Sequence, residues 1–214
     1  MAAALLLVGC GGGGGGDGEG KAEVPVAAAE ACHGLFRGDG GAALRVASGA
    51  EAFAPSTDGE SAKDAAGKLA AEPMDDGAWR EHRICSVRKG TEAGVADLTV
   101  TAERVRPGVA DAAQTGPGAA RYALARGAWA DASKAVVYID CVSPRLQGAD
   151  GASPAVVAVR AWNRDFPRGD DAKYREANLA LAHAAALPLV EALGCEDNGG
   201  VPDRLTVQRT PTTG

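Results

Sequence analysis

Strict alternation of apolar and polar residues predicts a β-strand near the middle of the chain. Between residues 95 and 105, one face would carry Leu98, Val100 and Ala102, and the other Asp97, Thr99, Thr101 and Glu103. Successive side chains of a strand point to opposite faces of the sheet. The pattern therefore predicts an antiparallel sheet with one apolar face and one solvated face.

A second predicted strand covers residues 134–142, which are rich in β-branched and aromatic side chains. Its two faces would carry Val137, Ile139 and Cys141 on the inside, and Tyr138 and Asp140 on the outside. Residues 82–88 and 154–162 read as further strands, and residues 201–210 as a short edge strand.

Helical patterns occupy most of the remaining chain. They predict helices at residues 26–36, 41–46 and 61–70, and a long final helix that Asp170 or Asp171 can cap and Gly194 can close. Pro188 should kink the last turns of that helix. We expect an α+β fold, with a mainly antiparallel sheet and helices packed on one face. Cys85 and Cys141 each lie on a predicted strand, and a second predicted strand follows each of them. This repeated order suggests that the chain has two similar halves.

Composition indicates one folded domain. The chain has 214 residues, of which 46% are hydrophobic and 23% charged. We expect a single globular domain over residues 23–209 and a disordered tail over 210–214. The net charge of −6 argues against nucleic-acid binding, which requires clustered Lys and Arg.

The first residues form a short apolar run that ends in Leu7-Val8-Gly9-Cys10. The run is too short to span a bilayer, so residues 1–9 read as a signal peptide. No Lys or Arg precedes Lys21, and we therefore expect the natural start to lie upstream. The alternative is an uncleaved low-complexity tail with an incidental cysteine.

The Leu-Val-Gly-Cys segment resembles the lipobox of bacterial lipoproteins. The resemblance implies that Cys10 is lipidated and becomes the first residue of the mature protein. Two or more acyl chains hold a protein firmly on a membrane. Residues 10–22 would then form a Gly-rich tether with a reach of roughly 18 Å.

Four cysteines remain once Cys10 is assigned to lipid: Cys32, Cys85, Cys141 and Cys195. An even number in an exported domain predicts two disulfides, for which three pairings are possible. We expect Cys32 to pair with Cys85, and Cys141 with Cys195. A helix packed on the inner face of the strand at residues 134–142 can bring Cys195 against Cys141.

A zinc site is the alternative use of the first two thiols, because His33 follows Cys32 and His82 precedes Cys85 by three residues. The spacing disfavours it, since His82 and Cys85 would point to opposite faces of a strand. Haem attachment fails because Ala29 stands where C-x-x-C-H needs a cysteine. We expect neither a metal nor a cofactor.

The overall layout resembles actinobacterial secreted lipoproteins of unknown function. The shared features are the lipobox, the Gly-rich tether, the early segment Ala31-Cys32-His33-Gly34-Leu35-Phe36, a cysteine-bearing middle strand and a C-terminal helix that ends near a cysteine. The resemblance implies a fold and a location on the outer face of the cytoplasmic membrane. It implies no catalytic residues.

Catalytic motifs are sparse. Ser48 lacks the first glycine of G-x-S-x-G, and the three histidines read as structural, with His183 on the apolar face of the last helix. The acid pairs Asp75-Asp76 and Asp170-Asp171 fit a turn and a helix start.

Trp162 and Arg164 form the one cluster that invites a binding hypothesis. The simpler interpretation is that Trp162 caps the core and Arg164 pairs with a nearby acid. We therefore predict a lipid-anchored, non-catalytic module of the cell envelope that binds an envelope protein or a glycan. The alternative is an extracytoplasmic hydrolase with a non-motif active site.

Overall fold

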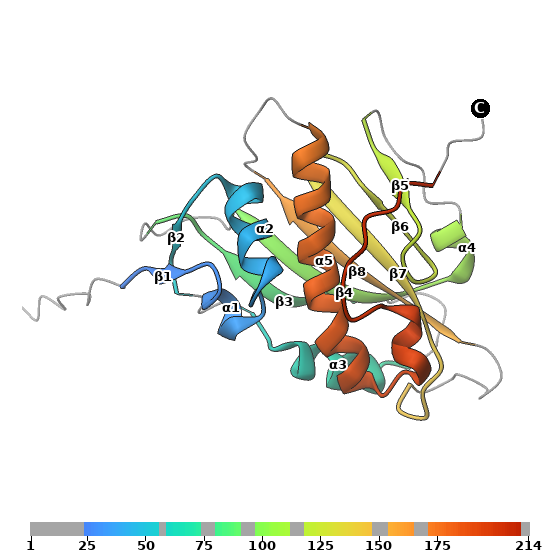
Figure 1. Cartoon of the computed structure of the whole chain (residues 1–214). Helices are drawn as coiled ribbons and strands as arrows, with labels where there is room; N and C mark the ends of the chain where they lie inside the picture. The colour runs from blue at the N-terminus through green and yellow to red at the C-terminus, as the bar shows by residue number, and fades with distance from the viewer. Residues whose placement is uncertain are drawn as a thin grey trace, which may run out of the picture.

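The architecture rests on a six-stranded antiparallel sheet with most of its helices on one face (Figure 1). The computed structural model describes residues 24–55, 59–73, 80–90, 97–111, 118–146, 154–164 and 171–210. In spatial order the strands are β3 (His82–Val87), β4 (Leu98–Val105), β8 (Ala155–Asn163), β7 (Lys134–Cys141), β6 (Gly127–Ala130) and β5 (Ala120–Tyr122). A separate pair joins β1 (Val26–Ala27) to β2 (Ala52–Phe53).

The predicted strand alternation is confirmed in β4 and β7. Val137, Ile139 and Cys141 enter the main core, whereas Val136 and Tyr138 belong to a smaller cluster on the opposite face. The strand at residues 82–88 is confirmed as β3, with a register shift between Arg83 and Cys85. This shift brings consecutive residues of β3 into the core, which simple alternation does not predict.

The main helices cover one face of the sheet, as predicted. They are α2 (Asp39–Ser48), α3 (Ala62–Ala71) and α5 (Asp171–Leu193), of which α2 and α3 pack against α5 and α5 packs against β7 and β8. Figure 1 shows α5 lying across the sheet with α2 beside it. Gly194, at φ +70°, ends α5 as expected.

The opposite face of the sheet is only partly solvated. The five-residue helix α4 (Pro107–Asp111) lies on it, so the prediction that helices occupy one face holds for all but α4. Here Ala110 packs with Trp129, Val136 and Tyr138 in the smaller cluster. The two halves share a cysteine-bearing hairpin, but helices precede it in the first half and follow it in the second.

The helix predicted at residues 26–36 is wrong. That segment contains β1 and only the short helix α1 (Ala31–Gly34), in which Cys32 and His33 have positive φ angles of 52° and 59°. The physical reason is tertiary: Cys32 is bonded to β3, and this attachment outweighs the helix propensity of the alanines.

The C-terminal segment follows the edge of β5, close to what the sequence predicts. A single β-bridge joins Arg209 to Tyr122, and the Ala123 and Thr210 amides donate to the carbonyls of Gln208 and Arg121. Residues 1–23, with Cys10, and residues 211–214 lie outside the described residues.

Candidate binding cleft

Two disulfides join the helical layer to the sheet, and both have the predicted pairing. Cys32 is bonded to Cys85 of β3 with a Cα–Cα distance of 5.6 Å, and Cys141 of β7 is bonded to Cys195 with 4.9 Å. The zinc alternative loses its thiolate ligands because both Cys32 and Cys85 are oxidised. In the described part of the chain, no cluster of three or more His, Cys, Asp or Glu side chains could hold a metal.

A cleft of about 710 Å³ opens beside the first disulfide, between α2, α3, α5 and the C-terminal segment. Its volume is within the range of about 300–1,000 Å³ that is typical of ligand sites. Its apolar floor includes Leu35, Ala184, Leu187 and Pro188. Charged side chains surround its mouth.

The rim of the cleft contains a left-handed turn. Cys32, His33 and Gly34 have consecutive positive φ angles of 52°, 59° and 78°. This conformation costs about 1–2 kcal/mol for each residue that has a Cβ atom. A Cβ added at Gly34 would lie 2.8 Å from Nε of Arg37, so the glycine also lets the guanidinium pack against the backbone. Backbone strain of this kind is concentrated at binding and catalytic sites.

Three cations from three separate segments line the mouth: Arg37, Lys63 and Arg204, each exposed. Asp39 and Asp203 are the acids of the same lining. Helices α2 and α3 both begin at the cleft, and the first turn of a helix carries a partial positive charge. The mouth therefore favours a ligand with a negative group.

The cleft also holds a serine and two histidines, but their contacts do not assemble a nucleophile and its base. The Ser61 hydroxyl donates its one proton to Asp64 Oδ2 at 2.7 Å, because Ser61 caps α3 in a capping box. His183 is 5% exposed, and its Nε2 donates to the Pro202 carbonyl at 2.7 Å. His183 is thus a hydrogen-bonded boundary residue of α5, as predicted, and His33 is exposed on the rim.

His82 is structural as well. Its Nε2 lies 2.7 Å from Glu72 Oε1, and Arg104 donates to the Glu72 carbonyl at 3.0 Å. Burial lowers the pKa of Arg104, an effect that the nearby Glu72 charge opposes. These contacts fix the end of α3 to β3 and β4. Ser48 is the last residue of α2, where its hydroxyl donates to the Leu44 carbonyl.

The predicted cluster of Trp162 and Arg164 is not part of the cleft. Trp162 is 45% exposed on the sheet face opposite the main helices, so the expectation that it caps the core is wrong. The neighbouring Asn163 takes the buried position and donates to the Ala47 carbonyl at 2.6 Å. Arg164 lies 3.6 Å from Asp97, which confirms the expected pairing with an acid.

The acid pair Asp75-Asp76 and Asp170 lie outside the described residues, whereas Asp171 begins α5. The cations of the cleft were missed because they come from segments up to 167 residues apart in sequence, from residue 37 to residue 204. The local signal is two glycines with positive φ angles: Gly34, which ends the left-handed turn, and Gly38, which follows it.

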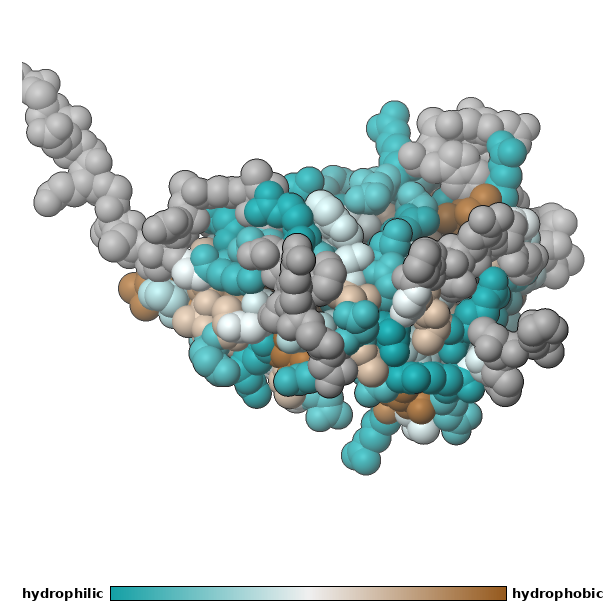
Figure 2. Space-filling view, turned by 90° about the horizontal axis from the view of Figure 1, so that it is seen from above, coloured by the Kyte–Doolittle hydropathy of each residue, from teal (hydrophilic) through white to brown (hydrophobic). Residues whose placement is uncertain are grey.

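Among the described residues, exposed apolar side chains do not form a broad docking surface. The large ones among the described residues are Val24, Val109, Trp162 and Val207. Figure 2 shows that apolar residues on the face seen from above form small patches between hydrophilic ones. No helix of the described structure has the length and apolar character needed to cross a membrane.

Comparisons with protein-family models, with curated proteins and with solved structures found no match to this chain.

Proposed function

We propose that the protein is a lipid-anchored, extracytoplasmic binding module of the cell envelope, of the kind found among actinobacterial lipoproteins of unknown function. Cys10 would attach it to the outer face of the cytoplasmic membrane, and the tether at residues 10–22 would hold the domain close to the surface. Two disulfides fit this location, because such bonds persist in oxidising compartments.

The observation that carries the binding role is the cleft with its apolar floor and three cations at its mouth. We infer a ligand with an apolar part and an anionic group. The hydrogen bonds of Ser61 and His183 favour binding over hydrolysis. The Ser61 hydroxyl donates to the Asp64 carboxylate and His183 Nε2 donates to the Pro202 carbonyl, so the histidine is not placed as a base for the serine.

The anchor is tested by intact-mass measurement of protein extracted from membranes. We expect a mass that corresponds to a chain beginning at Cys10 with at least two acyl groups. The Cys10→Ser variant should be released into the medium. An unmodified Cys10 in the membrane fraction would exclude the anchor without bearing on the cleft.

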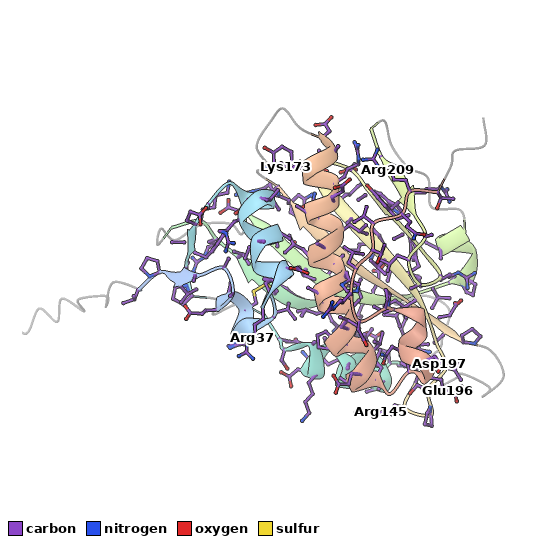
Figure 3. All side chains as sticks on the ribbon, in the orientation of Figure 1. Arg37, Arg145, Lys173, Glu196, Asp197 and Arg209 are labelled. Atoms are coloured by element: carbon purple, nitrogen blue, oxygen red, sulfur yellow. A yellow bond between two sulfur atoms is a disulfide. The ribbon has the colours of Figure 1, made fainter. Side chains whose placement is uncertain are left out.

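The cleft is tested with 8-anilinonaphthalene-1-sulfonate, a probe that joins an apolar ring system to one sulfonate. We expect the fluorescence to saturate as the probe is added. The Arg37→Ala variant should bind the probe with about tenfold lower affinity, equivalent to about 1.4 kcal/mol. Arg209→Ala is the matched control, because Arg209 is also exposed and Figure 3 shows it near β5, away from Arg37. Equal affinity of the Arg37 variant and the wild type would exclude this site.

The hydrolase alternative makes a different prediction for the same cleft. If it were correct, the protein would turn over p-nitrophenyl esters, and both Ser61→Ala and His183→Ala would abolish that activity. We expect no turnover above the buffer rate.

A further inference from the structure

The part of α5 that lines the cleft contains a proline. Pro188 lies inside this helix and is one of the residues of the cleft floor. Proline has no amide proton, so it cannot donate the helical hydrogen bond to the carbonyl four residues earlier. That carbonyl belongs to Ala184. In the described part of the chain, no residue outside α5 donates to it either.

The Ala184 carbonyl faces the cleft. In an α-helix, each carbonyl points along the axis toward the residue four positions later, and the side chains of two such residues share one face. Ala184 and Pro188 both line the cleft, and both are partly exposed. The carbonyl between them is therefore a hydrogen-bond acceptor that a ligand can reach, within a floor that is otherwise apolar.

This acceptor affects which ligands the cleft favours. In solution, water hydrogen-bonds to an accessible carbonyl, and a ligand that covers the carbonyl displaces that water. A ligand that cannot replace the lost hydrogen bond binds less tightly. The cleft should therefore prefer an apolar chain that carries a donor over one that carries none.

The acceptor also lies close to the charged mouth. A Cβ added at Gly40, in the first turn of α2, would lie 3.4 Å from Cβ of Ala184, so the two helices touch here. Gly40 follows Arg37 by three residues. In the described structure, the side chains of Arg37, Lys63 and Arg204 form no ion pair or hydrogen bond, so all three can meet an anionic group. The donor of a ligand should stand only a few bonds from its anionic group.

We propose that the cleft binds a 3-hydroxy fatty acid, that is, a carboxylate with a hydroxyl on the third carbon and an apolar chain beyond it. The carboxylate would face the three cations, the hydroxyl would donate to the Ala184 carbonyl, and the chain would cover the apolar floor. This inference rests on the binding function proposed for the cleft and specifies the class of its ligand.

The test compares two probes that differ by one oxygen atom, 3-hydroxydodecanoate and dodecanoate. Their binding is measured by calorimetry below the concentrations at which they form micelles. We expect the wild type to bind the hydroxy acid about tenfold more tightly, because only this probe replaces the hydrogen bond to the carbonyl. Equal affinities would overturn the proposal and leave the binding function of the cleft intact, whereas the absence of binding by either acid would overturn both.

The Pro188→Ala variant removes the free acceptor. It restores an amide to α5, and this amide should take up the Ala184 carbonyl. We expect the preference for the hydroxy acid to disappear, while dodecanoate binds at least as tightly as it does to the wild type. Pro107→Ala is the matched control, because Pro107 is also an exposed residue of a helix, α4, which lies on the opposite face of the sheet. A preference that persists in Pro188→Ala would overturn the proposal.

The carbonyl itself can be followed in the wild type, which keeps the test valid even if Pro188→Ala alters the shape of the cleft. In protein labelled with ¹³C and ¹⁵N, the carbonyl carbon of Ala184 is detected through the amide of Ala185. A carbonyl carbon moves downfield when it accepts a hydrogen bond. We expect its signal to lie further downfield in the complex with 3-hydroxydodecanoate than in the complex with dodecanoate. The same position in both complexes would overturn the proposal.

Discussion

The two disulfides allow a matched test of the strain in the left-handed turn. They join residues 53 and 54 positions apart, so they close loops of almost the same length. For loops of this size, the chain-entropy model gives about 4 kcal/mol of stabilisation for each bridge at 25 °C. Loop length alone predicts that removing either bridge lowers stability equally.

The turn makes the two bridges different. Cys32 itself has a φ of 52°, and His33 beside it has a φ of 59°, each worth about 1–2 kcal/mol of strain. When the bond to Cys85 is removed, this turn is free to relax. The release of its strain offsets about 2 kcal/mol of the stabilisation that is lost with the disulfide. Cys195, by contrast, has a φ of −67° and lies before left-handed Asp197 and Asn198, residue types that adopt this conformation more readily.

We therefore expect Cys32→Ala/Cys85→Ala to lower the free energy of unfolding by about 2 kcal/mol and Cys141→Ala/Cys195→Ala by about 4 kcal/mol. The assay is urea denaturation followed by far-UV circular dichroism, with the m-value compared between the two variants because both denatured states lose a cross-link of the same size. Losses that agree to within about 0.5 kcal/mol, or a larger loss at Cys32, would refute the idea that the turn is strained.

Further substitutions test the local interactions. Ser61→Ala should lower the free energy of unfolding by about 1 kcal/mol through loss of the α3 cap, measured by thermal denaturation. The Ser61 hydrogen bonds hold the pKa of Asp64 below its ordinary 3.8, so the wild type should lose this contribution as the pH falls through that lowered pKa, and the variant should lose less; parallel pH profiles would contradict this. Gly199→Ala should destabilise by about 2–4 kcal/mol because its Cβ would collide with a methyl group of β7, whereas Gly118→Ala, also at positive φ but with free space, should cost about 1 kcal/mol. Asn163→Ala should cost about 1–3 kcal/mol, since it leaves a buried carbonyl of α2 without its donor, and a loss under 0.5 kcal/mol would contradict that bond.

Side-chain periodicity predicted the parts of the fold in which local pattern and burial agree. In β4 and β7 the apolar positions alternate and face the core, and the position of Cys141 among them indicated its partner. Helix α3 could also be predicted from the sequence, because Ser61 and the alanines that follow it combine a cap with high helix propensity.

Strand β6 was missed because all of its residues but Trp129 are Gly or Ala, which carry little β-propensity. Strand β5 was missed because its 3 residues are too few to show an alternating pattern. They form because the Val-rich strand β7 offers an edge for pairing. The helix predicted at residues 26–36 does not form, because the disulfide to the distant Cys85 decides the conformation of Cys32. The candidate cleft could not be predicted, because it depends on the packing of segments that are distant in sequence.

The bond between Cys32 and Cys85 also determines how the domain would carry mechanical load. Cys32 lies eight residues after Val24, the first described residue, and is bonded to β3 at the edge of the main sheet. If Cys10 is fixed in the membrane, a pull on the tether reaches this covalent link before it reaches any of the larger helices. The force would pass directly into the sheet, and the cleft beside the link would keep its shape while the tether is under tension.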